Sequence, residues 1–296
     1  MQEKPVIAVL ITVHNRKETT IEALNRLSLQ KRRGEHFKLL VVITDDASTD
    51  GTADAIKKNF PETVVVAGNG QLYWGGGTRK AFREAAKHSP DFYLMLNDDT
   101  HLSLDAISRA LDVYAQKSEA SDMKLIVVGA TREPGANEIS YGGLERCSTI
   151  HPFRYRKVKL QADPQPCDTF NGNFVLIHQS VVDAIGFLDE RFTHRFGDID
   201  YGLVAAKAGI KIYVLPETVG ECLKNDGRQD WDSADLSFFS RLKEFFDVKG
   251  LPINESYYFC RKHGGKLWLV WWIMPIVRGL FFPTRPAQKR KKNTPA

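Results

Sequence analysis

Residues 92–100 read Phe-Tyr-Leu-Met-Leu-Asn-Asp-Asp-Thr, and they are the most informative part of this chain. The five consecutive apolar residues predict a buried strand, and two acids follow directly where it ends. Neighbouring carboxylates repel each other and are costly to hold beside a core unless a cation neutralises them. Hard oxygen ligands at the carboxyl end of a strand suit Mg²⁺ or Mn²⁺ that carries a phosphate group. A solvated acid pair that caps the next helix is the alternative interpretation.

The segments on either side of this strand alternate between strand and helix patterns. Apolar runs predict further strands at 6–13, 37–43, 64–66 and 125–129. A helix is predicted at 17–30, with Asn15 as its N-cap, and a short helix that ends at Lys58 follows the turn cluster at 48–52. Further helices are predicted at 78–88, after Gly75 or Gly76, and at 103–117. Residues 131–168 are irregular, and strands at 174–177 and 212–215 and helices at 180–185 and 198–208 follow. This order predicts an α/β fold in which helices flank a mostly parallel sheet.

Polar residues stand at the ends of four of these strands, at 12–15, 45–46, 69–70 and 97–99. Ligands of open α/β sheets bind beyond the carboxyl ends of the strands. Each cluster alone could be an ordinary turn, but the four together predict a nucleotide-phosphate site. The chain has no GxGxxG or Walker A pattern, and no Lys-Ser or Lys-Thr follows Gly75-Gly76-Gly77, so dinucleotide and P-loop sites are excluded.

Composition narrows the class of protein. The 296 residues are 43% hydrophobic and 26% charged, which is typical of a soluble globular protein. The four cysteines form no CxxC pair, and the chain begins without a signal-peptide pattern, so we expect free thiols in the cytoplasm. The net charge of +5 equals the contribution of five basic residues in the last dozen, Arg285, Lys289, Arg290, Lys291 and Lys292. The neutral body argues against nucleic-acid binding.

A set of short motifs, in this order along the chain, resembles family 2 glycosyltransferases of the GT-A fold. The motifs are residues 9–16 (Val-Leu-Ile-Thr-Val-His-Asn-Arg), 45–52 (Asp-Asp-Ala-Ser-Thr-Asp-Gly-Thr), 97–100, 170–174, 185–192 and 196–203. The rhamnosyltransferase-like branch, which builds bacterial surface polysaccharides, looks most similar, and the resemblance covers about residues 5–220. It implies a Rossmann-like GT-A fold and an inverting, metal-dependent transfer of a hexosyl or deoxyhexosyl group from a UDP or dTDP donor to a saccharide acceptor.

The resemblance also implies roles for single residues. Thr12, His14 and Asn15 match the segment around the nucleotide base and ribose, and Asp46 matches the acid that accepts a hydrogen bond from a pyrimidine N3–H. We add Asn69, at the end of the third strand, to this nucleotide-binding set. All five residues are expected at one edge of the sheet.

The remaining roles fall to acids. Asp98 matches the metal and ribose motif, and Asp99 is expected to coordinate Mg²⁺ or Mn²⁺ directly. Asp198 matches the general base that takes a proton from the acceptor hydroxyl, with Asp200 as the second candidate. The alternative for both is that they only cap the helix that begins there.

Two departures from the family pattern concern the metal and the base. Gly197 stands where many relatives carry Glu, and residues 216–226 lack the late His that often completes the metal site. The candidates for that missing ligand are Glu221, Cys222, Asn225 and His194. Tyr73 and Trp74 could stack on the donor or belong to the core.

The C-terminal segment is predicted to be a separate part. Residues 267–282 are almost entirely apolar and include three tryptophans, but they are too few to span a bilayer. With the basic tail they predict a helical, peripheral membrane contact at the cytoplasmic leaflet, which would suit a polyprenyl-diphosphate-linked acceptor. The alternative is a helix packed on the domain or in a dimer, so the oligomeric state is open. We expect domains at 1–250, divided into 1–130 and 131–250, and at 251–296.

Two other functions remain open on the sequence. A sugar-1-phosphate nucleotidyltransferase also uses an α/β sheet, acids and Mg²⁺, but it usually carries a Gly-rich basic loop after its first strand, and residues 12–17 contain no Gly. An inactive nucleotide-binding scaffold is the third interpretation, and the intact acids Asp46, Asp98, Asp99 and Asp198 argue against it.

Overall fold

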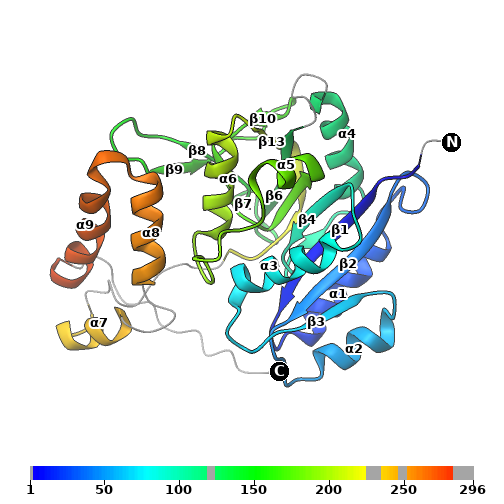
Figure 1. The fold of residues 1–296 in the computed structure, drawn as a ribbon, viewed down its shortest axis with the longest axis horizontal. Coiled ribbons are helices and arrows are strands. Elements are labelled where there is room, and N and C mark those ends of the chain that lie inside the picture. Colours follow the sequence, from blue (N-terminus) through cyan, green and yellow to red (C-terminus); the bar gives the residue numbers. More distant parts are fainter. Residues whose placement is uncertain (1–2, 119–123, 225–234, 246–251, 283–296) are drawn as a thin grey trace. The chain divides into compact units, whose positions relative to one another are not determined.

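The computed structural model describes residues 3–118, 124–224, 235–245 and 252–282 of the chain. It divides into two compact units, residues 1–224 and 225–296. The domain boundary expected at residue 250 lies outside the described residues. The first unit is an α/β structure whose main sheet is flanked by helices on both faces (Figure 1).

Four parallel strands form the first half of this sheet. β1 (Val6–Val13) lies between β2 (Lys38–Asp45) and β4 (Phe92–Leu96), and β3 (Val64–Ala67) pairs with the outer side of β2. Every residue of β4 is buried, as its continuous apolar sequence predicts for a strand covered on both faces. The carboxyl ends of all four strands therefore meet at one edge.

The second half of the sheet contains a reversal. β12 (Phe174–His178) is antiparallel to β4 on one side and to β6 (Leu125–Arg132) on the other, and β13 (Lys211–Glu221) runs parallel to β6. Because Phe174 pairs with Leu96, the turn that precedes β12 lies beside the residues that follow β4. The end of β13 reaches the same edge, since it runs in the direction of β6.

Helices cover both faces of the sheet (Figure 1). Alternate residues of β1 belong to different cores: Ile7, Val9 and Ile11 to one, Ala8 and Leu10 to the other. The first core includes apolar residues of α1 (Lys17–Ser28), α2 (Thr52–Asn59) and α4 (Ala106–Ser118). The second includes those of α3 (Tyr73–Ala86), α5 (Gln179–Ile185) and α6 (Gly197–Lys207).

Some local predictions were wrong in detail. Helix α3 begins at Tyr73 and not near Thr78, because the Asp46 carboxylate accepts hydrogen bonds from the backbone N–H groups of Leu72 and Tyr73 and so caps the helix earlier. Asn15 does not cap α1: the N–H of Lys17 donates instead to Asp50 Oδ2, at 3.0 Å.

The segment expected to be irregular, 131–168, contains short strands. They are β7 (Ile139–Tyr141), β8 (Gly143–Arg146), β9 (Tyr155–Lys157) and β10 (Gln165–Pro166), and β11 (Thr169–Phe170) follows. β8, β9 and β11 form a second, three-stranded sheet. β10 pairs with β13, and β5 (His101–Leu102) pairs with the far end of β13. Each strand is too short to show a clear periodicity in the sequence.

The second unit is helical in its described residues, with α7 (Phe238–Phe245), α8 (Ile253–His263) and α9 (Trp268–Phe281). Tyr257 of α8 contacts the rings of Trp268 and Trp272 edge-on, with centroid separations of 5.3 and 5.4 Å. Phe245 of α7 and Leu280 of α9 form a small core of their own. Among the described residues, no helix has the length and apolar character needed to cross a bilayer.

Candidate active site

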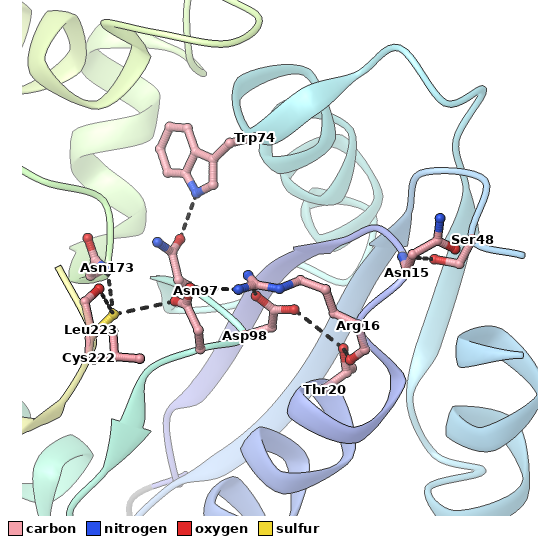
Figure 2. A network of polar contacts seen from close by, with 11 residues as sticks. Asn15, Arg16, Thr20, Ser48, Trp74, Asn97, Asp98, Asn173, Cys222 and Leu223 are labelled. Atoms are coloured by element: carbon pink, nitrogen blue, oxygen red, sulfur yellow. Dashed lines mark hydrogen bonds and ion pairs between the residues drawn. The ribbon is translucent and has the colours of Figure 1, made fainter. Parts of the chain in front are cut away.

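An acid pair and an arginine meet at the carboxyl edge of the sheet. Arg16 reaches from the start of α1, and its Nη1 lies 2.7 Å from Asp98 Oδ1 while its Nη2 lies 3.1 Å from Asp99 Oδ2 (Figure 2). The Asp98 side chain is 3% exposed and that of Asp99 is 21% exposed. Sequence reasoning missed Arg16 as their partner. The sequence did contain a signal for this partner: Arg16 directly follows the polar residues at the end of β1, the strand that pairs with β4.

The charges of this trio depend on one another. Burial raises the pKa of Asp98 to about 6; the Arg16 guanidinium opposes this rise and the neighbouring Asp99 adds to it. Burial by itself would lower the pKa of Arg16, but attraction to the two acids raises it above its ordinary value. Arg16 therefore stays a cation, and its single positive charge is shared between two carboxylates.

Among the described residues of the late segment 216–226, Cys222, which follows β13, contacts the acid pair. Its thiol is buried and donates to Asp99 Oδ1 at 3.5 Å, and Asn173 Nδ2 donates to the same sulfur at 3.5 Å (Figure 2). Burial, with the charge of Asp99, raises the pKa of this thiol to about 12. Of the other proposed ligands, Glu221 pairs with Arg132, His194 lies against the Tyr73 ring, and Asn225 is outside the described residues.

The donor set suits a hard divalent cation that brings most of its own ligands. Within the part of the chain that the structure describes, no three His, Cys, Asp or Glu side chains form a metal-binding group. Mg²⁺ commonly binds through one or two carboxylates together with water and substrate phosphates. Asp98 and Asp99 already hold a positive group between them, so the residues present fit such an ion. The assignment of the metal to Asp99 stays a prediction.

The residues expected to bind the nucleotide lie in loops that are tied to one another. His14 Nδ1 lies 2.7 Å from the backbone oxygen of Asp46, and Asn15 Oδ1 accepts from the N–H of Thr49 at 2.7 Å. Asn15 also takes a positive φ of 52°, which places its backbone N–H toward Ser48 Oγ at 2.9 Å (Figure 2). The loop after β1 and the loop after β2 are thereby held as one surface.

Asp46 has a structural task that the sequence did not reveal. Its Oδ1 accepts from the N–H of Gly70 at 2.7 Å, and its Oδ2 accepts from the N–H groups of Leu72 and Tyr73 at 2.9 and 3.1 Å. Because a carboxylate oxygen has two lone pairs, Oδ1 retains one acceptor position for a further donor. Its role toward a pyrimidine stays a prediction.

Two further predicted residues border this surface. Asn69 is exposed, and its Oδ1 accepts from the N–H of Gln71 at 3.0 Å, which closes a turn in the loop around Asp46. Thr12 Oγ1 lies 3.3 Å from Thr78 Oγ1, and a Cβ added to Gly77 would meet Thr12 Cγ2. Helix α3 thus approaches the end of β1 closely because Gly77 has no side chain.

Asp198 lies in the first turn of α6 and is connected to the acid pair by one turn of the backbone. Its Oδ2 accepts from the N–H of Gly172 at 3.0 Å, and its Oδ1 accepts from the N–H of Ile199 at 2.8 Å. Asn173, which follows Gly172 in the chain, accepts on its backbone oxygen a hydrogen bond from the N–H of Asn97 at 3.3 Å. Asn97 directly precedes the acid pair. Burial raises the pKa of Asp198, while its two backbone hydrogen bonds limit the rise.

Trp74 fills the space between these two parts of the site. Its Nε1 donates to Asn97 Oδ1 at 2.7 Å (Figure 2). A Cβ added to Gly172 would lie 2.3 Å from Trp74 Cζ2, and one added to Gly197 would lie 3.7 Å from Trp74 Cζ3. The first turn of α6 thus lies within ordinary contact distance of the indole at Gly197, whereas Gly172 approaches the ring too closely for any side chain. The indole is a partly buried spacer that joins Asn97 to the segment holding Asp198.

This mixed sheet, with its acids gathered at the carboxyl edge and a carboxylate from a later helix beside them, is a GT-A fold. Residues 8–186 match the model of glycosyl transferase family 2, and the chain belongs to that family. The predicted fold and the family resemblance are thus confirmed. Membership favours the glycosyltransferase interpretation over a sugar-1-phosphate nucleotidyltransferase.

Among curated proteins, two similar sequences are N-acetylglucosaminyl-diphospho-decaprenol L-rhamnosyltransferases of Mycobacterium tuberculosis, from strains CDC 1551 / Oshkosh and ATCC 25618 / H37Rv. Each is 22% identical over 196 residues, which is 59% of this chain and 63% of the relative. The chain thus spans less than two thirds of the length of the curated relatives it matches.

Among solved structures, the mannosyltransferase PcManGT of Pyrobaculum calidifontis, in complex with GDP-Man and Mn²⁺, is similar with a TM-score of 0.53 and 16% identity. The match covers 88% of this chain and 65% of that one. TarS of S. aureus, residues 1–349, has a TM-score of 0.53 at 15% identity, over 94% of this chain and 81% of TarS. A second TarS structure is in complex with UDP-GlcNAc. At these identities the likeness concerns the fold.

Proposed function

We propose that the protein is an inverting, metal-dependent glycosyltransferase that moves a hexosyl or deoxyhexosyl group from a UDP or dTDP donor to a saccharide carried on a polyprenyl diphosphate. Its place would be bacterial surface polysaccharide synthesis. One observation carries the proposal: the turn at Gly172 and Asn173 binds the Asp198 carboxylate with one residue and the Asn97 backbone with the next. The proposed base and the cation-binding acid pair are thereby fixed on one surface.

Asp198 is the proposed general base. A sugar hydroxyl is a weak nucleophile, and a carboxylate within hydrogen-bonding distance can take its proton as the new bond forms. The raised pKa of Asp198 makes it a stronger base than an exposed aspartate. Each of its oxygens accepts one backbone hydrogen bond, so both keep a lone pair for the acceptor hydroxyl. A single displacement with the base on the side opposite the leaving group inverts the anomeric centre.

The leaving group is a nucleoside diphosphate, on which negative charge develops. A divalent cation held by Asp99, with Asp98 beside it, would offset that charge. The Arg16 guanidinium, which is 44% exposed, is a second positive group at the same edge. Thr12, His14 and Asn15 would enclose the base and ribose, and the remaining acceptor position on Asp46 Oδ1 supports a uracil or thymine N3–H.

The similar proteins differ in the donors and acceptors that their names give. The Mycobacterium tuberculosis proteins are named for an acceptor on decaprenyl diphosphate, the Pyrobaculum enzyme is in complex with GDP-Man, and TarS is in complex with UDP-GlcNAc. A guanine donor must therefore be included in any test of donor choice.

The experiment that tests this function is calorimetric titration of UDP, dTDP, GDP and CDP into the full-length protein, once with Mn²⁺ and once with EDTA. We expect UDP or dTDP to bind tightly only with Mn²⁺, and CDP and GDP to bind weakly, because they do not present the same N3–H to Asp46. Preferential binding of GDP would contradict the role of Asp46. If the folded protein binds none of the four nucleotides, the enzyme proposal should be abandoned for an inert scaffold.

Helix α9 supports a peripheral membrane contact at the inner face of the cell membrane. Its inward side packs through Trp272, whose Nε1 donates to Ser256 Oγ at 3.2 Å, and through Leu280. The other side is exposed and apolar at positions spaced for one helical face: Leu269, Val270, Ile273, Met274, Val277 and Phe281. Burying this face in lipid, next to the basic tail, would bring the enzyme to a lipid-linked acceptor.

Sedimentation with vesicles tests the contact. Full-length protein should sediment with vesicles that contain anionic phosphatidylglycerol, and should do so much less with neutral phosphatidylcholine. Truncation after Lys266 should release it. Ile273→Asp with Met274→Asp should also release it, while Trp272 and Leu280 keep their packing. Undiminished sedimentation of both variants would mean that α9 serves only as a packing helix.

A further inference from the structure

We infer that Arg16 is a built-in counter-cation of the acid pair, and that a divalent cation must displace it from Asp99 in order to bind. Arg16 would thereby set the metal affinity of the site. The inference rests on the proposed metal-dependent function and names the residue that regulates it.

The geometry shows one guanidinium shared by two carboxylates. Nη1 contacts Asp98 and Nη2 contacts Asp99, so the planar group spans the pair in the position of a bridging cation. Among the described residues, Arg16 is the cation that forms an ion pair with either acid. The backbone of Arg16 is fixed, because its carbonyl oxygen accepts from the N–H of Thr20 at 2.9 Å and from Thr20 Oγ1 at 2.8 Å. A change of the Arg16 side-chain rotamer would therefore not require the backbone to move.

The two halves of this contact differ in strength. The bond to Asp98 is 2.7 Å long, and Asp98 is nearly fully buried. The bond to Asp99 is longer, at 3.1 Å, and Asp99 is partly open to solvent. An incoming cation would therefore reach Asp99 first. The other oxygen of Asp99 faces the Cys222 thiol, which leaves Oδ2, the atom held by Arg16, as the accessible ligand.

Like charges cannot share that oxygen at close range. A divalent cation on Asp99 Oδ2 and a guanidinium nitrogen on the same atom would repel each other strongly in this partly buried site. Arg16 must then give up Asp99, and Asp98 remains its partner through the shorter bond. The freed Nη2 would point to the same edge where the donor diphosphate lies, so metal binding would present a phosphate-binding group at the same time.

The test is titration of Mn²⁺ alone, followed by the electron paramagnetic resonance signal of free Mn²⁺, into four full-length proteins: wild type, Arg16→Gln, Arg16→Lys and Arg26→Gln. Arg26 is the matched control, because it lies on α1, which Arg16 precedes, and pairs with a different acid, Glu22. We expect Arg16→Gln to bind Mn²⁺ at least about tenfold more tightly than wild type, since the competing charge is removed. Arg16→Lys should be intermediate, and Arg26→Gln should stay within about twofold.

The inference is overturned if Arg16→Gln, or Arg16→Lys should the first variant fail to fold, binds Mn²⁺ no more tightly than wild type. Calorimetry with UDP and dTDP separates this failure from failure of the proposed function. If Mn²⁺ binds wild type and the Arg16 variants equally, and nucleotide binding needs Mn²⁺, the metal-dependent function stands and only the role of Arg16 falls. If no variant binds Mn²⁺ but UDP binds in EDTA, both the role of Arg16 and the metal dependence are wrong.

Discussion

Asp198→Asn is expected to lower the rate of sugar transfer by about 10²- to 10⁴-fold, the usual contribution of a general base, while nucleotide affinity stays within a few-fold. The substitution preserves the size of the side chain, and its one remaining oxygen can still accept from the N–H of Gly172 or of Ile199. The base acts on the acceptor hydroxyl, so donor binding should be little affected. Single-turnover transfer and calorimetric titration of UDP and dTDP with Mn²⁺ measure the two quantities separately.

Asp200→Asn is the matched comparison, since Asp200 is the rival candidate two residues later and is buried in the same helix. A large loss of rate in the Asp200 variant, with Asp198→Asn still active, would move the base to Asp200. Equal losses of rate and nucleotide affinity in Asp198→Asn would instead show that its carboxylate holds the site together through Gly172 and does not take a proton.

Gly75→Ala should reduce transfer by about a hundredfold, because overpacking there displaces the segment that leads to Asp198 and so misplaces its carboxylate. A Cβ on Gly75 would lie 2.6 Å from the backbone oxygen of Phe192 and 2.9 Å from that of Thr193. The N–H of Gly75 also donates to Thr193 at 2.7 Å, so the two segments have no room to separate without losing a bond. A stability loss of about 1–3 kcal/mol should accompany the change.

Gly76→Ala is the control for this effect. It changes the next residue of the same helix, but the nearest neighbour of the new Cβ is Leu72 Cβ at 3.3 Å, so a shift of a few tenths of an ångström is enough to admit it. Its transfer rate should stay within a few-fold, and its stability should be equal or higher by up to about 1 kcal/mol, since Ala favours a helix over Gly. Urea unfolding and the single-turnover assay distinguish the two variants. Wild-type rate in Gly75→Ala would mean that Asp198 does not depend on this close approach.

The parts of the fold that local patterns predict are those set by burial along the strand. The bounds of β1 were predicted to the residue, and the polar clusters after β1, β2, β3 and β4 do lie at one edge. A continuous apolar run followed by acids carries this information in consecutive residues. The mostly parallel sheet followed from the alternation of elements, and the antiparallel insertion of β12 did not, because pairing partners are distant in sequence.

The parts of the site that escaped prediction depend on contacts between distant segments. Asp46 determines where α3 begins, because its Oδ2 accepts a hydrogen bond from the N–H of Tyr73, which lies 27 residues later in the chain. Arg16 forms ion pairs with acids 82 and 83 residues away, and no local sequence pattern predicts such a pair. The role of Asp198 came from the family resemblance. Its link to the acid pair through Gly172 and Asn173 is visible only once the chain is folded.

The position of β12 has a consequence for how the enzyme admits its substrates. β12 forms ladder hydrogen bonds with β4 on one side and β6 on the other, so the half that carries Asp46 and Asp98 and the half that carries Asp198 share one uninterrupted sheet. Hinge bending between the two halves would break these buried hydrogen bonds, and each buried group left unpaired would cost about 1–3 kcal/mol. We therefore expect the loops at the carboxyl edge to move when substrates enter and leave, while the sheet beneath them keeps its shape.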